Sequence, residues 1–101
     1  MGKYQVELTD QAIEDLREAY EYYDSIKPNL GFEFFAAMQQ ELEKLESFPH
    51  YQKIYKQLRR ITNRRFKYNI YFYVEEQVNY KTIVIAFLHG SRDESAWKDR
   101  L

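Results

Sequence analysis

The spacing of apolar residues changes from helical to extended at Pro49, and this change limits the folds open to the sequence. Before Pro49, apolar residues recur at helical spacing over residues 10–25 and again from near Leu30 onward. After Pro49, extended segments are indicated over residues 55–61, 68–75 and 82–89. The sequence therefore predicts an α+β fold in which the helices precede most of the sheet.

The N-terminal half is predicted to contain one strand and two helices. Residues 4–8 alternate strictly between apolar and polar side chains, as in a half-buried strand, and Thr9 can cap the helix that follows. Pro28 breaks that helix, and Asn29 can cap the second one. Because the connection is short, we expect an antiparallel two-helix hairpin. A three-strand antiparallel meander completes the prediction, with all strands in one sheet and turns at residues 62–64 and 76–79.

In the strand expected at residues 68–75, the side chains divide into an apolar face and a polar-aromatic face. The two sets are Tyr68, Ile70, Phe72 and Val74 against Asn69, Tyr71, Tyr73 and Glu75. If helices cover only the apolar face, Tyr71 and Tyr73 are open to a bound protein partner or to a second copy of the chain. Residues 83–88 are apolar on both faces, so this last strand is expected to be central and covered on each side.

The composition is that of one globular domain over residues 1–101, with 45% apolar and 31% charged residues. The chain has no Cys, which excludes disulfides and thiolate metal sites. Residues 1–8 hold no apolar run suited to a signal peptide, so we expect a cytoplasmic protein without membrane contact. His50 is a lone loop histidine, and we expect neither a metal nor another cofactor.

Charge is divided unevenly along the chain, although the formal net charge is only −1. Residues 1–47 hold 4 Lys and Arg against 11 Asp and Glu, whereas residues 48–101 hold 11 against 5. Residues 56–67 contain no Asp or Glu and six basic residues: Lys56, Arg59, Arg60, Arg64, Arg65 and Lys67. We call this segment the basic run. Two interpretations stay open, since this run either binds an anionic target or acidic partner, or forms a solvated hairpin that pairs with the acidic helices.

Three stretches resemble the RelE/ParE superfamily, the toxins of bacterial type II toxin-antitoxin systems. Residues 31–49 are similar to the family's second helix, an amphipathic Leu-rich run that closes with Phe-Pro. Arg65-Phe66-Lys67-Tyr68-Asn69-Ile70-Tyr71-Phe72 resembles a family strand that reads basic-aromatic-x-Tyr-basic-aliphatic. Leu88-His89-Gly90-Ser91-Arg92-Asp93, followed by Trp97, resembles the family's strand-end signature and is closer to the ParE branch, the plasmid stabilisation type.

The resemblance implies a growth-inhibiting toxin that a cognate antitoxin neutralises. In the ParE branch the toxin acts on DNA gyrase, and in the RelE branch it is a ribosome-dependent, metal-independent endoribonuclease of mRNA. The RNase needs a proton acceptor, a proton donor and cations around the phosphate. A third reading is a non-toxic domain that keeps the fold only to bind a partner. A homodimer or a heterotetramer with the antitoxin is compatible with these readings.

Two positions depart from the RNase pattern. Asn69 stands where the resembling RNases carry an Arg beside the strand Tyr, which removes a positive charge from the expected phosphate position. Trp97 lies near the position of the RNases' terminal Tyr or His, and an indole exchanges no proton near neutral pH. The pI of about 6.1 is also low for family members that act on nucleic acid. We therefore expect gyrase binding without catalysis ahead of RNA cleavage.

The residues expected to contact a target or an antitoxin lie in the second half of the chain. They are Arg59, Arg60, Arg64, Arg65, Lys67, Tyr71, Tyr73, His89 and Arg92. If the chain is an RNase, the catalytic candidates are Arg60, Lys67, His89 and Arg92. His89 is either a titratable site residue or a partly buried side chain that orders the turn, whereas Trp97 is expected to close the core. The hypothesis requires a curved sheet that gathers the arginines and His89 at one concavity.

Overall fold

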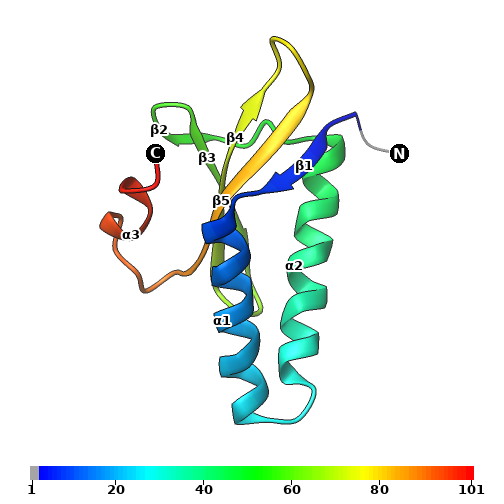
Figure 1. The fold of residues 1–101 in the computed structure, drawn as a ribbon, viewed down its shortest axis with the longest axis vertical. Coiled ribbons are helices and arrows are strands. Elements are labelled where there is room, and N and C mark those ends of the chain that lie inside the picture. The colour runs from blue at the N-terminus through cyan, green and yellow to red at the C-terminus, as the bar shows by residue number, and fades with distance from the viewer. Residues whose placement is uncertain (1–2) are drawn as a thin grey trace.

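A five-stranded sheet carries a helical hairpin on one face and a short C-terminal helix on the other (Figure 1). The computed structural model describes residues 3–101, so the first two residues of the N-terminal segment discussed above lie outside it. The elements in chain order are β1 (Gln5–Leu8), α1 (Asp10–Ile26), α2 (Leu30–Ser47), β2 (Lys53–Tyr55), β3 (Leu58–Asn63), β4 (Tyr68–Glu75), β5 (Lys81–His89) and α3 (Ser95–Lys98). None of the helices in residues 3–101 has the length and apolar character needed to span a membrane. The predicted α+β fold is confirmed.

Local sequence signals explain both ends of the helical hairpin. The Thr9 side chain accepts a hydrogen bond of 3.2 Å from the Ala12 N–H, so the predicted cap of α1 is confirmed. Asn29 precedes α2 as predicted, but it makes no side-chain cap hydrogen bond. Its φ of 72° lies in the left-handed region that Asn tolerates, so Asn29 turns the chain between the helices instead of capping α2. Figure 1 shows α1 and α2 running antiparallel, as expected.

The sheet has the order β1-β5-β4-β3-β2. β3, β4 and β5 form the predicted antiparallel meander, and β1 adds to β5 in parallel, with Val6 opposite Thr82. The single strand expected at residues 55–61 is wrong, because a tight turn at Lys56, where φ is 52°, divides it into β2 and β3. The next turn lies at residues 64–67, later than the expected 62–64, since Asn63 still pairs with Tyr68.

The two faces of the sheet bury separate apolar clusters. The cluster under the helical hairpin contains Phe34, Met38, Ile70, Phe72 and Phe87. The cluster on the opposite face contains Leu58, Tyr71, Ile85, Leu88 and Trp97. Side chains of β5 enter both clusters, and β5 lies between β1 and β4, so its predicted central position is confirmed. Trp97 closes the second cluster, as expected from its size.

Hydrogen bonds between Arg100 and Asp15 join the C-terminal segment to α1, beside the part of β5 that extends beyond β1; we call this contact the clasp. The β4–β5 register skips Ile85, which is therefore a bulged residue whose carbonyl is turned away from the ladder. Arg100 donates to that carbonyl oxygen at 3.0 Å, and its guanidinium holds both carboxylate oxygens of Asp15 at 2.5 and 3.1 Å. Asp15 also accepts from the Phe87 N–H at 3.0 Å. Asp15 and Arg100 thus bond the backbone N–H and carbonyl groups of β5 at the part of its edge where, within residues 3–101, no strand is paired.

Candidate functional site

On the sheet face opposite the helical hairpin, one arginine from a strand and one from the segment after another strand meet at one hollow. Arg60 projects from β3, and Arg92 follows the end of β5. The hollow has a volume of about 280 Å³ and is also lined by Ile54, Asn69, Tyr71, Gly90, Glu94 and Trp97. Within residues 3–101, neither Arg60 nor Arg92 makes an ion pair. We call this feature the arginine hollow.

A short chain of hydrogen bonds lies along one side of the arginine hollow. The Thr62 hydroxyl donates to Asn69 Oδ1 at 2.7 Å, and the Asn69 amide donates to the Tyr71 hydroxyl oxygen at 3.2 Å. The Tyr71 ring stacks on the Trp97 indole with ring centroids 5.4 Å apart. Asn69 is therefore held as a neutral bridge between two strands.

The strand-end segment of residues 88–93 is ordered by contacts of its own. The His89 imidazole Nδ1 lies 2.9 Å from the Ser91 hydroxyl and accepts from the Ser91 N–H at 3.1 Å. The Gly90 N–H donates to the Lys67 carbonyl at 2.7 Å, and a Cβ on Gly90 would lie 3.2 Å from that same oxygen. His89 therefore orders the turn through its contacts with Ser91. Its side chain is only partly buried, so it also stays accessible as a candidate site residue.

His89 lines a second hollow, of about 210 Å³, between α1 and the end of β5. Asp15, Glu18, Tyr68 and Arg92 contribute to this hollow, so Arg92 is shared between the two. Burial raises the pKa of the Tyr68 phenol to about 12, with a further contribution from Tyr23. Tyr68 therefore stays protonated near neutral pH and is not a proton acceptor there.

The basic run does not gather at one concavity, and that expectation is wrong. Strand alternation sends Arg59 to the helix face, where it donates to the Tyr51 carbonyl at 2.6 Å, and sends Arg60 to the opposite face. Arg65 pairs with Glu33 of α2. Arg64 and Lys67 lie in the β3–β4 turn, and Lys67 has a φ of 58°. Arg65 thus pairs with an acidic helix, as expected if the run forms a solvated hairpin. Of the basic run, Arg60 alone lines the arginine hollow.

The expected exposure of Tyr71 and Tyr73 is also wrong. Tyr71 is 4% exposed and Tyr73 is half-buried, because the C-terminal segment folds back and places Trp97 over this face of the sheet. The helical hairpin covers only the other face, as assumed. The face that carries Tyr71 and Tyr73 is covered by α3, and this helix was not predicted because it has only four residues. These rings are therefore walls of the second cluster and not a free aromatic surface.

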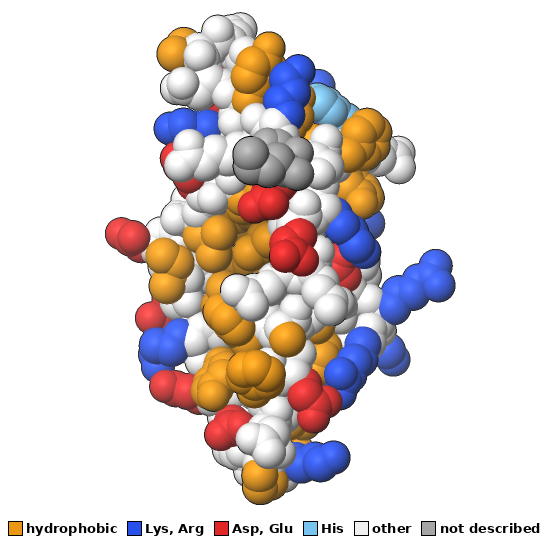
Figure 2. Space-filling model, turned by 90° about the vertical axis from the view of Figure 1, so that its right-hand side faces the viewer, with side chains coloured by type: hydrophobic (Ala, Val, Ile, Leu, Met, Phe, Trp, Pro, Cys, Tyr) orange, Lys and Arg blue, Asp and Glu red, His pale blue; other side chains and the backbone are white. Residues whose placement is uncertain are grey.

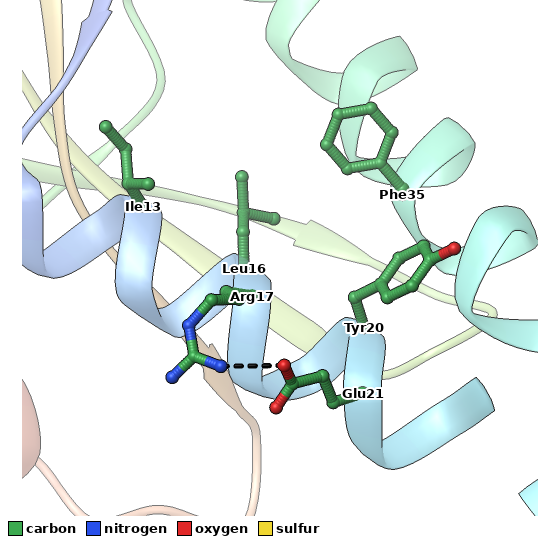
Figure 3. Close-up of a pocket in the computed structure, with 6 residues that line it drawn as sticks. All are labelled: Ile13, Leu16, Arg17, Tyr20, Glu21 and Phe35. Carbon is green, nitrogen blue, oxygen red and sulfur yellow. Dashed lines mark hydrogen bonds and ion pairs between the residues drawn. The ribbon is translucent and has the colours of Figure 1, made fainter. Parts of the chain in front are cut away.

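Sequence reasoning missed an apolar groove between the two long helices. Ile13, Leu16 and Tyr20 of α1 and Phe35 of α2 line it, with Arg17 and Glu21 at its edge. Figure 3 shows Ile13 and Leu16 projecting from α1 on the side of Phe35, while Arg17 pairs with Glu21 along α1. Ile13 is 52% exposed, and the groove has a volume of about 420 Å³. The helical spacing of apolar residues predicted the two helices but did not show that part of each apolar face stays exposed; the width of those faces was the available signal.

Acidic residues accompany the exposed apolar side chains of the hairpin. In Figure 2, hydrophobic side chains form a band along the long axis, with acidic side chains beside it. Beside the groove, Arg17 is enclosed between Glu14 and Glu21, which neutralises the positive charge there. Asp10 and Asp24 are further acids on the exposed surface of α1, whereas Glu18 lines the second hollow on the β5 side of the helix. The groove therefore has apolar walls and a predominantly acidic surrounding.

Another polar cluster joins Tyr4, which precedes β1, to the start of the β4–β5 turn. The Tyr4 hydroxyl donates to the Glu76 carboxylate at 2.5 Å, and the His50 Nε2 lies 3.2 Å from the same oxygen. The hydrogen bond from Tyr4, followed by that from His50, lowers the pKa of Glu76. Among residues 3–101, no three His, Asp or Glu side chains come together as a metal-ligating group. His50 thus has a structural contact that the sequence did not indicate.

Comparison with known proteins supports the resemblance over most of the chain. The sequence model of the family described as "ParE toxin of type II toxin-antitoxin system, parDE" matches residues 6–94. None of the curated proteins matches the sequence.

Among solved structures, the chromosomal ParDE toxin-antitoxin system from P. aeruginosa matches with a TM-score of 0.74 and 15% identity, covering 86% of this chain and 96% of that one. The isolated E. coli RelE toxin matches with a TM-score of 0.56 and 16% identity, covering 97% and 99%. An E. coli RelE mutant in complex with a peptide of the antitoxin RelBc matches with a TM-score of 0.55 and 11% identity, covering 98% and 95%. At these identities the structures show a shared fold, and the family match shows membership. The chain belongs to the ParE toxin family of type II toxin-antitoxin systems.

Proposed function

We propose that this chain arrests growth by binding DNA gyrase and does not itself cleave RNA. The observation that carries the proposal is Asn69, a neutral amide that bridges Thr62 and Tyr71 where an RNase of this fold needs a cation for the phosphate. The indole of Trp97 is buried in a stack with Tyr71 and exchanges no proton near neutral pH. Binding without catalysis demands neither a proton donor nor a proton acceptor.

Purified protein and induced cells test this proposal together. With gyrase, ATP and plasmid DNA, the protein is expected to inhibit supercoiling and to accumulate cleaved DNA held by gyrase. In induced cells, growth should stop while mRNA stays intact. Growth arrest with normal supercoiling and normal replication would contradict the proposal. Expression that does no harm in the absence of any antitoxin would instead favour a non-toxic partner-binding domain.

One observation favours the RNase as a second candidate. Arg60 and Arg92 share a hollow, and His89 lies beside Arg92 in the adjacent one, so two guanidinium groups and one imidazole lie in the same region. Lys67 contributes its carbonyl to the Gly90 turn next to them. The catalytic candidates on this reading are those four residues. If simultaneous replacement of Arg60 and Arg92 by Gln leaves mRNA cleavage at the full rate, the RNase candidate is abandoned.

We further propose that a cognate antitoxin neutralises the toxin by laying an amphipathic helix in the groove of Ile13, Leu16, Tyr20 and Phe35. Apolar walls of this kind accept helix anchors spaced by three or four residues. The acidic residues beside the groove favour an antitoxin helix with Lys or Arg flanking its apolar stripe. An antitoxin peptide bound to a mutant of E. coli RelE, a protein of the same fold, provides a precedent for a segment-sized partner.

The antitoxin proposal can be tested with the product of the neighbouring reading frame. Ile13→Glu and Phe35→Glu each place a charge in the groove and should weaken the complex with purified antitoxin by about tenfold or more. Ile26→Glu is the matched control, because Ile26 is equally exposed on α1 but does not line the groove. Gel filtration with light scattering of the same complex distinguishes a homodimer from a heterotetramer. Equal binding by all three variants would exclude the groove.

A further inference from the structure

The free hydrogen-bonding groups of the arginine hollow are mostly donors. The guanidinium groups of Arg60 and Arg92 have no ion-pair partner among residues 3–101. The Asn69 oxygen is occupied by Thr62, whereas its amide, one of whose protons goes to Tyr71, still has a second proton to donate. Glu94, the single acid of the lining, pairs with Lys98 at 3.4 Å. The complementary ligand is therefore an anion.

The fork of an arginine suits two kinds of anion, a carboxylate and a phosphate, and the aromatic residues separate them. Single-stranded RNA is held by bases that stack on exposed aromatic faces. Here Tyr71 and Trp97 stack on each other, and they are 4% and 5% exposed. Tyr55, the next ring, is T-shaped against Trp97 and has Lys56 and Lys98 over it at 5.3 and 4.8 Å. The rings that would stack bases are already covered.

We propose that the arginine hollow binds carboxylate side chains of an acidic segment of a protein partner. The inference rests on the proposed function in one respect, that the chain acts by binding a protein. Arg60 and Arg92 would hold the first carboxylate, and the Ile54 side chain offers an apolar wall for its methylene groups. Lys56, which lies over the Tyr55 ring next to Trp97, extends the positive charge beyond the hollow, so a further acid along the same segment would also be paired.

The position of the hollow makes this partner distinct from the helix proposed for the groove. The hollow lies on the face of the sheet covered by α3, whereas the groove lies between α1 and α2. The groove is surrounded by acids and favours a basic helix, and the hollow is basic and favours an acidic segment. One partner could occupy either surface while leaving the other accessible.

Trp97 is the only Trp of the chain and lines the hollow, so its fluorescence reports occupancy. The protein should be titrated with a blocked peptide of alternating Glu and Gly, with the same peptide carrying Gln in place of Glu, with inorganic phosphate and with oligouridylate. The Glu peptide is expected to give a saturable change that the Gln peptide does not give. Replacing Arg60 and Arg92 together by Gln should weaken binding about tenfold or more, because two charge-assisted contacts are lost.

The control variant is Lys27→Gln, which removes one positive charge from the exposed turn between α1 and α2 without altering the hollow. It should bind the Glu peptide within about twofold of the unmodified protein, since a distant exposed charge is largely screened. Arg60→Lys keeps the charge but loses the fork, and should give an intermediate affinity. Thermal unfolding of each variant shows that the fold is retained.

Three results would overturn the proposal. Tighter binding of oligouridylate than of the Glu peptide would assign the hollow to nucleic acid, and phosphate binding as tight as the peptide would leave only a general anion site. An unchanged affinity in the Arg60 and Arg92 double variant would place the peptide elsewhere. Gyrase inhibition is measured separately, so peptide binding without gyrase inhibition would refute the proposed function alone, and gyrase inhibition without peptide binding would refute this inference alone.

Discussion

Replacing Arg100 by Gln should destabilise the protein strongly although Arg100 is the second-last residue of the chain. The Arg100 and Asp15 side chains are 15% and 9% exposed, and Arg100 also donates to the carbonyl of the bulged Ile85. The change leaves Asp15 as a carboxylate removed from water with the Phe87 N–H as its remaining partner. Removing one member of a buried pair costs about 3–5 kcal/mol, and the partial exposure of Arg100 places the expected loss near about 3 kcal/mol.

Urea unfolding followed by far-UV circular dichroism and by Trp97 fluorescence measures this loss. For a domain of this size, a loss of about 3 kcal/mol lowers the melting temperature by roughly 12–24 °C. Asp15→Asn and the double variant complete a cycle, which should show a coupling energy of about 1–3 kcal/mol between the two residues. Arg17→Gln is the matched control, because Arg17 pairs with Glu14 and Glu21 at an exposed site and should cost less than about 1 kcal/mol.

The two probes also test how the clasp acts. Arg100 and Trp97 belong to the same C-terminal segment. If the clasp holds that segment in place, Trp97 fluorescence of the Arg100→Gln variant should change at a lower urea concentration than its circular dichroism. A loss for Arg100→Gln below about 1 kcal/mol, or additive effects of the two single variants, would refute the reasoning. Either result would mean that the clasp is formed but contributes little to stability.

Other perturbations test the core and the polar contacts. Gly31→Ala should lower the free energy of unfolding by about 1–3 kcal/mol, because the alanine Cβ would lie 2.6 Å from the Tyr20 carbonyl oxygen. An unchanged urea midpoint would show instead that α1 and α2 move apart at little cost. Phe34→Ala, at a residue with no exposure, should cost about 3–5 kcal/mol, and a cost under about 1 kcal/mol would contradict the packing described. The folded-state pKa of Glu76 is lowered from 4.5 by its hydrogen bond from Tyr4, so its contribution is present above pH 4.5 and is lost as the pH falls through the folded-state pKa. Unfolding from pH 3 to 7 should therefore show a smaller acid loss in Glu76→Gln than in the unmodified protein, and parallel pH profiles would refute this contribution.

Local sequence patterns determined the elements and much of their order. The Thr9 cap, the break at Pro28 and the end of α2 before Pro49 are visible in the sequence because each depends on neighbours within four residues. The apolar character of both faces of β5 predicted its central position for the same reason. The strand-end signature predicted the family, which the match over residues 6–94 confirms.

Only the tertiary structure decided which surfaces are free. Strand alternation alone could not show that Trp97 returns to cover Tyr71, because the two residues meet through a C-terminal segment whose four-residue helix carries little periodicity. Strand alternation separates Arg59 from Arg60, but the pairing of Arg65 with Glu33 of α2 depends on how the hairpin packs and was not visible in the sequence. Asp15 and Arg100 are 85 positions apart, so their pairing is invisible to any local pattern. Periodicity reports whether a side chain faces a core, whereas the partner that covers it is set by contacts between distant parts of the chain.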